Sequence, residues 1–242
     1  MNECTVKVMQ WNIHHGEDVN GRIDLKKQAD VILRCNPDVV AINEVDKNSP
    51  RTNFIDTPAM LATLSGMIPI FGATMVRPPE GLYGNLILSR FKVNFIGSWL
   101  IPAVASESRG VTLVEIMAPQ PFYLAVTHFS HRQNPEENAA RVQQAQAILT
   151  KISQFAADRP AIIIGDLNCA PDSDPIKAFE AAGYQIGEPL LSHPADAPDR
   201  ALDYIVYNKL DKRLEVIDRH TVDEKVASDH LPLVNTLKIK AE

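Results

Sequence analysis

The sequence predicts an α/β fold in which two β-sheets pack face to face and helices cover their outer faces. Segments with strand patterns outnumber helical ones, and several follow one another directly, which argues against a simple alternating βα barrel. The segment Ala161–Gly165 (AIIIG) is too uniformly apolar to face water, so both of its faces need cover. No Pro-, Gly- or Ser-rich linker divides the chain, so we expect one domain over residues 1–242.

The expected strands are runs rich in branched and aromatic apolar residues, bounded by turn residues. In chain order they are Thr5–Trp11, Val39–Asn43, Gly84–Ser89, Asn94–Leu100, Val111–Met117, Phe122–Thr127, Ala161–Gly165, Asp203–Tyr207, Leu214–Asp218 and Leu233–Ile239. The segments Gly66–Leu82 and Gly187–Arg200 show no such pattern. We expect both of these segments to be loops that determine specificity.

Two helices are expected in the first quarter of the chain. Asp24 is placed to cap a helix that runs to about Arg34, with Leu25, Gln28, Ala29 and Ile32 on one face. The range Asn53–Leu64 also has helical spacing, although Pro58 lies inside it.

Two further helices are expected in the second half. In Pro135–Ala156, apolar residues repeat at helical spacing, and a proline suits the first turn. A short helix is expected after Asp174, with Pro175 at its first position.

The charge of the chain bears on what it can bind. The net charge is −6, and the Lys and Arg residues are scattered. A protein that holds long nucleic-acid tracts usually has a basic stripe, because phosphate contacts supply most of that affinity. The local cluster Lys209 to Arg213 is interrupted by Asp211. These features argue against a processive or tight nucleic-acid binder, but they leave small phosphorylated substrates open.

The cysteines and the N-terminus bear on location. Cys4, Cys35 and Cys169 are too few and too far apart for a disulfide framework or a CxxC zinc site, which predicts a reducing compartment, the cytoplasm. Cys169 is expected to be a small buried apolar group. The start MNECTVKVMQW indicates a strand rather than a signal peptide, although a signal removed upstream would leave no trace. No apolar run approaches about 18 residues, so no transmembrane helix is expected.

Polar side chains that can bind a metal or move a proton stand at the ends of several expected strands. They are Asn12 after VMQW, Glu44 after VVAIN, His128 after YLAVT, Asp166 and Asn168 after AIIIG, Asp203 at the start of DYIVY, and Asp229 and His230 before LPLV. Strand ends gather at one edge of a sheet, and open α/β sheets commonly bind ligands there. We therefore expect these residues to form one site.

The residue types at these ends suit the hydrolysis of phosphate esters. Carboxylates are the ligands that Mg²⁺ requires, and a cation held by one or two of them keeps positions for phosphate oxygens and water. A further carboxylate can orient or deprotonate the attacking water. A histidine needs a carboxylate partner to set its tautomer, and Asp203 is available for His230.

Each of these residues also has an ordinary structural explanation. An Asp after a strand is more often a turn former, and a His among apolar residues is more often structural. The tripeptide SDH at 228–230 suits a helix or turn cap. The functional interpretation is favoured because six such positions occur in one chain, each at the end of a strand.

Together these segments resemble the endonuclease/exonuclease/phosphatase superfamily, which includes deoxyribonuclease I-like nucleases, abasic-site endonucleases, sphingomyelinases, inositol-polyphosphate 5-phosphatases and deadenylases. The matching segments, in the order of the family, are QWNIHHG (10–16), VVAINEVD (39–46), YGNLILSR (83–90), VTHFSH (126–131), IIIGDLNCAPDS (162–173), LDYIVY (202–207) and ASDHLPLV (227–234). The resemblance implies a four-layer α/β sandwich, with two mixed β-sheets packed face to face and helices outside. It also implies one site that depends on Mg²⁺ or Mn²⁺.

The resemblance also implies a role for each matched residue. It implies a metal site made by Glu44, Asn12 and Asp229. It implies catalytic roles for Asp166, which positions or activates water, for Asn168, which contacts phosphate, for the couple of His230 with Asp203, and for His128. Substrate contacts are expected from Asn85, Arg109 and His14. His131, His193 and His220 lie in polar stretches and are assigned no role.

The chain departs from some branches of the superfamily. Abasic-site endonucleases carry an Asp where this chain has His14, and they lack a histidine at the place of His128, which argues against DNA repair. The segments WNIHHG and YGNLILSR resemble the small bacterial members.

The expected activity is therefore hydrolysis of a phosphate ester by in-line attack of an activated water. The substrate class stays open among nucleic acids, lipid head groups and small phosphoesters, as do monoester against diester and the number of ions. No protein partner is predicted. The alternative is a non-catalytic phosphate-binding or scaffold relative of the same fold, which the presence of every expected site residue disfavours.

Overall fold

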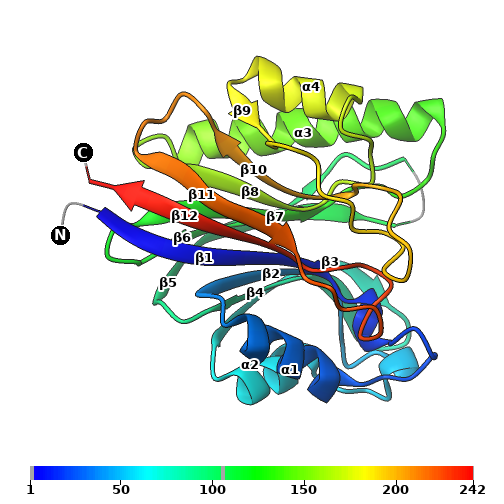
Figure 1. The fold of residues 1–242 in the computed structure, drawn as a ribbon. Coiled ribbons are helices and arrows are strands. Elements are labelled where there is room, and N and C mark those ends of the chain that lie inside the picture. Colours follow the sequence, from blue (N-terminus) through cyan, green and yellow to red (C-terminus); the bar gives the residue numbers. More distant parts are fainter. Residues whose placement is uncertain (1–2, 105–106, 242) are drawn as a thin grey trace.

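A computed structural model of the chain describes residues 3–104 and 107–241. Over these ranges two six-stranded mixed sheets face one another, and two helices cover the outer face of each sheet (Figure 1). The expected four-layer α/β sandwich is confirmed.

The first sheet has the strand order β11–β12–β1–β2–β4–β3. Its strands are β1 (Glu3–Asn12), β2 (Val39–Lys47), β3 (Ile68–Arg77), β4 (Gly81–Ser89), β11 (Leu214–Thr221) and β12 (Leu233–Lys240). Strands β1 and β2 are parallel, and the other neighbours in this sheet are antiparallel. The β1–β2 pair sets the carboxyl ends of two strands side by side.

The second sheet repeats this arrangement, with the order β5–β6–β7–β8–β10–β9. Its strands are β5 (Val93–Ile101), β6 (Arg109–Ile116), β7 (Phe122–His128), β8 (Ala161–Asp166), β9 (Tyr184–Gln185) and β10 (Asp203–Asn208). Here β7 and β8 form the parallel pair, at the centre of an otherwise antiparallel sheet.

Four α-helices in the described ranges form the outer layers: α1 (Leu25–Cys35) and α2 (Thr57–Ser65) beside the first sheet, and α3 (Pro135–Phe155) and α4 (Asp174–Ala181) beside the second (Figure 1). Local signals explain their starts. Asp24 accepts a hydrogen bond from Lys27 N at 3.0 Å, and Asn134 accepts one from Glu137 N at 2.9 Å. Short 3₁₀ turns, η1 (His14–Gly16) and η2 (Pro50–Thr52), follow β1 and β2.

The buried apolar residues form three layers, as a four-layer sandwich requires. The central layer includes Phe122, Leu124 and Ile164 between the sheets. A second layer, with Phe129 and Phe179, joins the second sheet to α3 and α4, and a third, with Trp11, joins the first sheet to α1 and α2. The run AIIIG is therefore covered on both faces, as its sequence predicted.

Three expectations about elements were wrong. The expected loop Gly66–Leu82 contains β3, whose pattern is broken by a proline and a glycine; β3 is an edge strand, where a proline is tolerated. The expected helix Asn53–Leu64 begins only at Thr57, with Asp56 as its cap, so Pro58 falls in the first turn. Helix α4 starts at Asp174 itself, which puts Pro175 at its second residue rather than its first.

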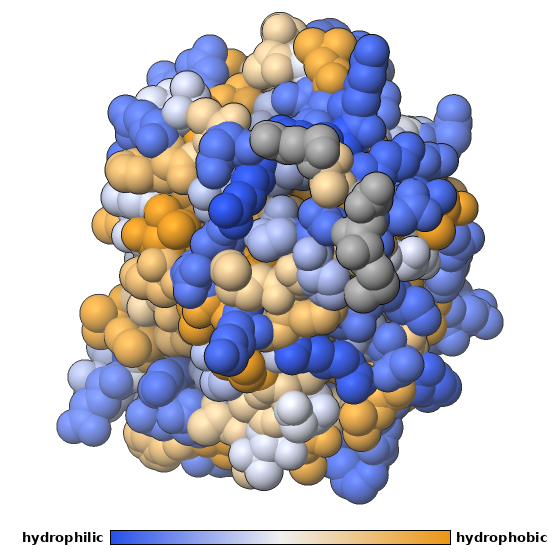
Figure 2. All heavy atoms as spheres, turned by 90° about the vertical axis from the view of Figure 1, so that its left-hand side faces the viewer, coloured by the Kyte–Doolittle hydropathy of each residue, from blue (hydrophilic) through white to orange (hydrophobic). Residues whose placement is uncertain are grey.

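None of the helices within the described ranges is long and apolar enough to cross a membrane. Figure 2 shows the end of the molecule where β1 begins and β12 ends, and there apolar side chains form small groups among hydrophilic ones. The candidate site lies at the opposite end, where β1 and β8 terminate.

Candidate active site

The two parallel pairs bring the expected site residues to one edge of the sandwich. Asn12 ends β1 and pairs with Asn43 on β2, while His128 ends β7 and pairs with Asp166 at the end of β8. Because both pairs end at the edge where η1 begins (Figure 1), the two sheets contribute side chains to a common site.

Glu44 reaches this site because of a β-bulge in β2. Ile42 pairs with Leu86 and Val45 with Gly84, so Asn43 and Glu44 together lie opposite the single residue Asn85. Glu44 has a φ of 59°, a left-handed conformation that is uncommon outside glycine. A bulge of this kind turns a side chain away from the alternating pattern of its strand. The bulge therefore aims the Glu44 carboxylate at the cleft.

Left-handed backbone recurs around the site. His14, His15 and Asn168 have φ values of 46°, 47° and 48°. Such conformations cost energy, of order 1–3 kcal/mol each, and they persist where surrounding contacts hold them. At His14 the backbone N–H donates to Asn12 Oδ1 at 3.0 Å, and at Asn168 the N–H donates to Asp166 Oδ1 at 2.9 Å. The side chains of the site thus hold the turns that follow them.

Asp166 lies at the centre of the site. Its Oδ2 accepts a hydrogen bond from Asn12 Nδ2 at 3.0 Å and lies 3.6 Å from His128 Nε2 and 3.8 Å from His230 Nε2. Asn12 Nδ2 also donates to Glu44 Oε1 at 3.0 Å. One amide group therefore joins the carboxylate from the first sheet to that from the second.

Gly165 is required for the position of Asp166. A Cβ at this residue would lie 2.0 Å from the carbonyl oxygen of Thr127 on the neighbouring strand β7. Only glycine allows β7 and β8 to approach so closely just before they end.

His230 and Asp203 form the expected couple. His230 Nδ1 lies 2.7 Å from Asp203 Oδ2, and both residues are buried. Burial favours the neutral imidazole and lowers the pKa of His230. The negative charges of Asp203, which has the largest effect, and of Asp166 and Asp229 outweigh burial and raise this pKa to about 10. Despite its burial, the pKa of Asp203 is lowered by His230 and by hydrogen bonds from Ser192 and Gln10. The couple is therefore an ion pair near neutral pH.

The pKa of Asp166 is raised, whereas that of Asp203 is lowered. Burial and the negative charge of Asp203 raise the pKa of Asp166 to about 7, although His230 and the hydrogen bond from Asn12 act against this rise. A carboxylate with a pKa near the working pH is suited to exchange a proton with water.

His128 is a neutral imidazole. Burial and the positive charge of Arg109 hold its pKa well below the usual value. Its Nδ1 lies 3.4 Å from Arg109 Nη1, and its Nε2 lies 3.0 Å from Asn168 Nδ2. His128 thus contacts Arg109 and Asn168 through its two ring nitrogens and lies next to the carboxylate of Asp166.

Seven of the eleven expected site residues line a cleft of about 290 Å³, and Asn12 and Asp203 lie outside its lining. It is lined by His14, His15, Glu44, Arg51, Arg77, Tyr83, Glu107, Arg109, His131, Asp166, Asn168, Asp229 and His230. Asn85 and His128 border a separate small space beside Arg109 instead. Asn85 is buried, and its Oδ1 accepts a hydrogen bond from Asn43 Nδ2 at 2.8 Å.

Three arginines line the cleft, and the sequence pattern pointed only to Arg109. Arg51 follows β2 in η2 and binds Asp46 through two nitrogens, at 2.6 and 2.9 Å. Arg77 ends the unexpected strand β3, and its guanidinium lies 4.8 Å from the centre of the Tyr83 ring. Both residues lie outside the apolar patterns of the sequence, so only the packing of β3 and η2 reveals them. Their charges suit an anionic ligand.

Two histidines that were assigned no role lie close to the site. His131 borders the cleft, and its Nδ1 lies 3.2 Å from Arg109 Nη2. The ring centre of His193 lies 4.5 Å from that of His230, and its Nε2 lies 3.9 Å from Asp229 Oδ2. His220 instead forms an exposed pair with Asp218. Sequence position alone did not separate these histidines.

Buried amides hold the two sheets together beneath the site. Asn43 on β2 accepts hydrogen bonds from Asp166 N at 2.8 Å and from Gln10 Nε2 at 2.7 Å, and it donates to Thr127 O at 2.8 Å. Gln10 also donates to Asp203 Oδ1 at 3.1 Å. In the sequence, Asn43 and Gln10 are recognisable as polar residues within otherwise apolar strands.

The donor chemistry of the cleft fits a hard divalent cation. Glu44, Asp166 and Asp229 present carboxylates to it, and Mg²⁺ needs only one or two carboxylates because it keeps several waters. Asn12 is oriented differently from a metal ligand: its Nδ2 faces Glu44 and Asp166, while its Oδ1 accepts from His14 N. In this orientation Asn12 positions the carboxylates, and its oxygen would reach a cation only after the amide turned.

Cys169 is buried beside Asn168, as expected for a small apolar group. Burial raises the pKa of its thiol to about 11, which keeps it protonated and unreactive near neutral pH.

Comparison with known proteins shows which chains and folds this protein is similar to. The chain is 25% identical over 180 residues to the uncharacterized protein YbhP of Escherichia coli (strain K12), and the match covers 69% of this chain and 68% of YbhP. The structure of an endonuclease/exonuclease/phosphatase from Beutenbergia cavernae DSM 12333 superposes with a TM-score of 0.78 and 24% identity, over 98% of this chain and 72% of that one. The mannosyl-6-phosphatase Bt3783 of Bacteroides thetaiotaomicron VPI-5482 superposes with a TM-score of 0.74 and 13% identity, over 96% and 99% of the two chains.

At these identities the solved structures establish the fold alone. The family is established by the sequence, because a model of the Endonuclease/Exonuclease/phosphatase family matches residues 9–230. The chain therefore belongs to the endonuclease/exonuclease/phosphatase family.

Proposed function

We propose that this protein is a divalent-metal-dependent hydrolase that cleaves a phosphate ester by in-line attack of water oriented by Asp166. Members of the family are hydrolases that act on phosphoester bonds. The observation that carries the proposal is the surroundings of Asp166. This buried carboxylate has a pKa of about 7 and lies within 4 Å of Asn12, His128 and His230 at the cleft.

The two titrating groups of the site take different roles in this proposal. Asp166 exchanges a proton near neutral pH and can accept one from the attacking water. His230 keeps its charge because Asp203 stabilises the imidazolium, so it stabilises negative charge that develops on the phosphate and can protonate the leaving oxygen. The environment of each group, rather than its residue type, separates the base from the cation.

Glu44 and Asp229 are the residues that would hold Mg²⁺ or Mn²⁺, with Asn12 beside them. When bound, the cation neutralises charge on the phosphate oxygens. The side chains of Arg51, Arg77 and Arg109 add cationic donors along the cleft that can contact an anionic substrate, and Asp46 and Glu107 balance part of their charge. His128 and Asn168, hydrogen-bonded to each other, orient groups around Asp166.

The substrate class is open among nucleic acids, lipid head groups and small phosphoesters. A panel with Mg²⁺ or Mn²⁺ tests it directly: plasmid DNA, single-stranded RNA, sphingomyelin, phosphoinositides, sugar phosphates and bis-p-nitrophenyl phosphate. The proposal expects metal-dependent turnover on at least one of these esters. Metal binding without turnover on any of them would favour the non-catalytic phosphate-binding relative instead.

The role of Asp166 is tested with Asp166→Asn on the best substrate of that panel. Loss of the group that orients water is expected to lower kcat by about 10²–10⁴-fold. The matched control is Asp223→Asn, which alters an aspartate whose side chain is 82% exposed and should leave kcat unchanged. Turnover by Asp166→Asn at the rate of the natural protein would refute the assignment.

The cysteines bear on where this activity would take place. Cys4, Cys35 and Cys169 are all free thiols in the structure. Their free state supports the proposal that the protein works in a reducing compartment, the cytoplasm.

A further inference from the structure

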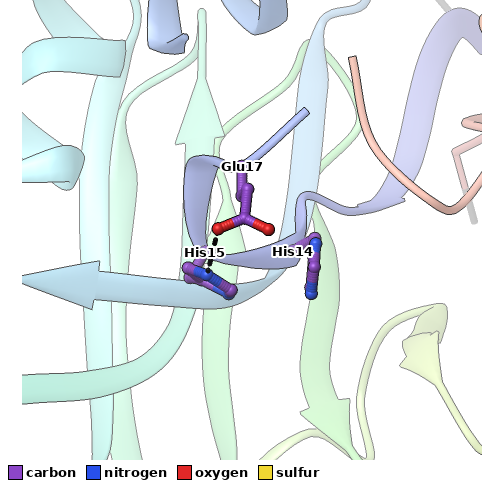
Figure 3. A group of neighbouring side chains, drawn as sticks. All are labelled: His14, His15 and Glu17. Atoms are coloured by element: carbon purple, nitrogen blue, oxygen red, sulfur yellow. Dashed lines mark ion pairs between the residues drawn. The ribbon is translucent and has the colours of Figure 1, made fainter. Parts of the chain in front are cut away.

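We propose that His14, His15 and Glu17 form a second metal site, which binds a transition-metal cation such as Zn²⁺. One ligand atom from each of these side chains lies within 4.8 Å of those from the other two. Figure 3 shows the Glu17 carboxylate directed at the two imidazole rings, which stand on either side of it. The site needs no turnover and does not depend on the proposed hydrolysis.

The spacing of the ligand atoms suits a zinc ion with little movement. Zinc bonds of about 2.1 Å in tetrahedral geometry place neighbouring ligand atoms about 3.4 Å apart. His15 Nε2 and Glu17 Oε2 are 3.6 Å apart, longer than a hydrogen bond and close to that spacing. The rings of His14 and His15 meet edge to face, with centres 4.5 Å apart, so the two imidazoles do not stack.

The nitrogen of His15 that faces the proposed site is Nε2. His15 is only 9% exposed, and its unpaired, buried Nδ1 points away from Glu17, so this nitrogen would not contact the cation. The other nitrogen of His15 faces Glu17, at a distance typical of two ligands of one cation rather than of a hydrogen bond.

The loop that carries these ligands is held in place by the protein. Glu17 N donates to His14 O at 2.8 Å, and Asp24 N, at the cap of α1, donates to Gly16 O at 3.0 Å. Gly16 has a φ of 99°, and a Cβ there would lie 2.8 Å from Leu25 Cδ2. The ligands are thus presented by a turn fastened to α1, which lowers the entropic cost of binding a cation.

The donor set distinguishes this site from the Mg²⁺ site proposed at Glu44. Two imidazoles and one carboxylate are typical ligands of Zn²⁺, whereas Mg²⁺ takes oxygen donors. Three protein ligands also leave one tetrahedral position open. Because His14 and His15 border the same cleft as Glu44, the bound cation would add positive charge at its margin.

A competing group of donors, His193, Asp229 and His230, is less suited to a metal. His230 Nδ1 lies 2.7 Å from Asp203 Oδ2, and its Nε2 lies 3.8 Å from Asp166 Oδ2, so both ring nitrogens face carboxylates of the active site. In the first group, by contrast, His15 Nε2 and Glu17 Oε2 are 3.6 Å apart, which is too far for a hydrogen bond. This difference favours the group of His14, His15 and Glu17.

The test measures metal binding by the whole chain without any substrate. Zn²⁺ is titrated calorimetrically in the presence of excess Mg²⁺, and Co²⁺ is followed by its visible absorption. We expect one ion per chain, and Glu17→Gln and His15→Ala should each weaken its binding by about 10–100-fold. His220→Ala, which removes an exposed histidine from its pair with Asp218, is the matched control and should bind like the natural protein.

Several outcomes would overturn the proposal. They are the absence of Zn²⁺ binding by the natural protein, unchanged affinity in Glu17→Gln, and loss of binding in His193→Ala instead. Glu17 is partly exposed, so its variant should fold even if a change at the buried His15 disturbs the turn, and circular dichroism checks this point. The anomalous signal of zinc in a crystal of the metal-soaked protein should lie between the three side chains.

Discussion

Replacing Asp203 with asparagine should lower the pKa of His230 from about 10 to about 6.5 or below. The carboxylate of Asp203 lies 2.7 Å from His230 Nδ1 and is the main cause that raises this pKa, whereas burial lowers it. A rise from 6.5 to about 10 corresponds, at about 1.4 kcal/mol per unit, to a few kcal/mol of preference for the charged imidazole. The new amide keeps a polar neighbour for the ring but removes the charge, so burial then dominates.

This change should also alter how stability depends on pH. A histidine whose pKa is raised by folding contributes stability that is fully present below about pH 6.5, its unfolded value, and is lost as the pH rises through about 10. The natural protein should therefore exceed Asp203→Asn in unfolding free energy by the largest margin near about pH 6, and by a smaller margin near about pH 10.

Two measurements on metal-free protein check this reasoning. Titration by NMR follows the ring signals of His230, and urea denaturation at both pH values gives the free energy of unfolding. The control is Asp218→Asn, which removes the exposed pair with His220 at 2.9 Å and should change stability by less than about 1 kcal/mol. A His230 pKa that stays near about 10 in Asp203→Asn, or an equal stability gap at both pH values, would refute the assigned ion pair.

Three further changes probe the metal site and the fold. Glu44→Gln should weaken Mn²⁺ binding in calorimetry by about 10–100-fold, and unchanged affinity would move the cation away from Glu44. Gly165→Ala would place a Cβ 2.0 Å from Thr127 O, so urea denaturation should show a loss of at least about 1–3 kcal/mol, whereas a neutral effect would contradict the close strand approach. Phe122→Ala empties a fully buried position between the sheets and should cost about 3–5 kcal/mol, while Phe54→Ala, at a residue 58% exposed, should cost far less.

Most strands and helices follow from local patterns because burial imposes a periodicity on the sequence. The run Ala161–Gly165 had to be covered on both faces, and the Asp24 cap set the start of α1. Strand β3 was missed because an edge strand lacks a continuous apolar pattern. Its Pro69 and Gly72 break the run, and pairing with β4 on one side is enough to order it.

The candidate site could be predicted in part for a related reason. Polar groups at strand ends stand out against apolar runs, so Asn12, Asp166 and His230 are recognisable from the sequence as candidate site residues. Arg51 and Arg77 lie in segments without such a contrast. Arg77 enters the cleft because β3 pairs with β4, and Arg51 lies there with its guanidinium 5.6 Å from the ring centre of Tyr83 on β4.

The amino-acid order therefore settles which chemical groups are present and which segments can be buried, since both are local properties of the chain. It does not settle how those groups are charged or aimed. The bulge that turns Glu44, and the raised pKa values of Asp166 and His230, arise from residues far apart in sequence. Electrostatic interaction and loss of solvent act through space, so they exist only once the two sheets have closed on each other.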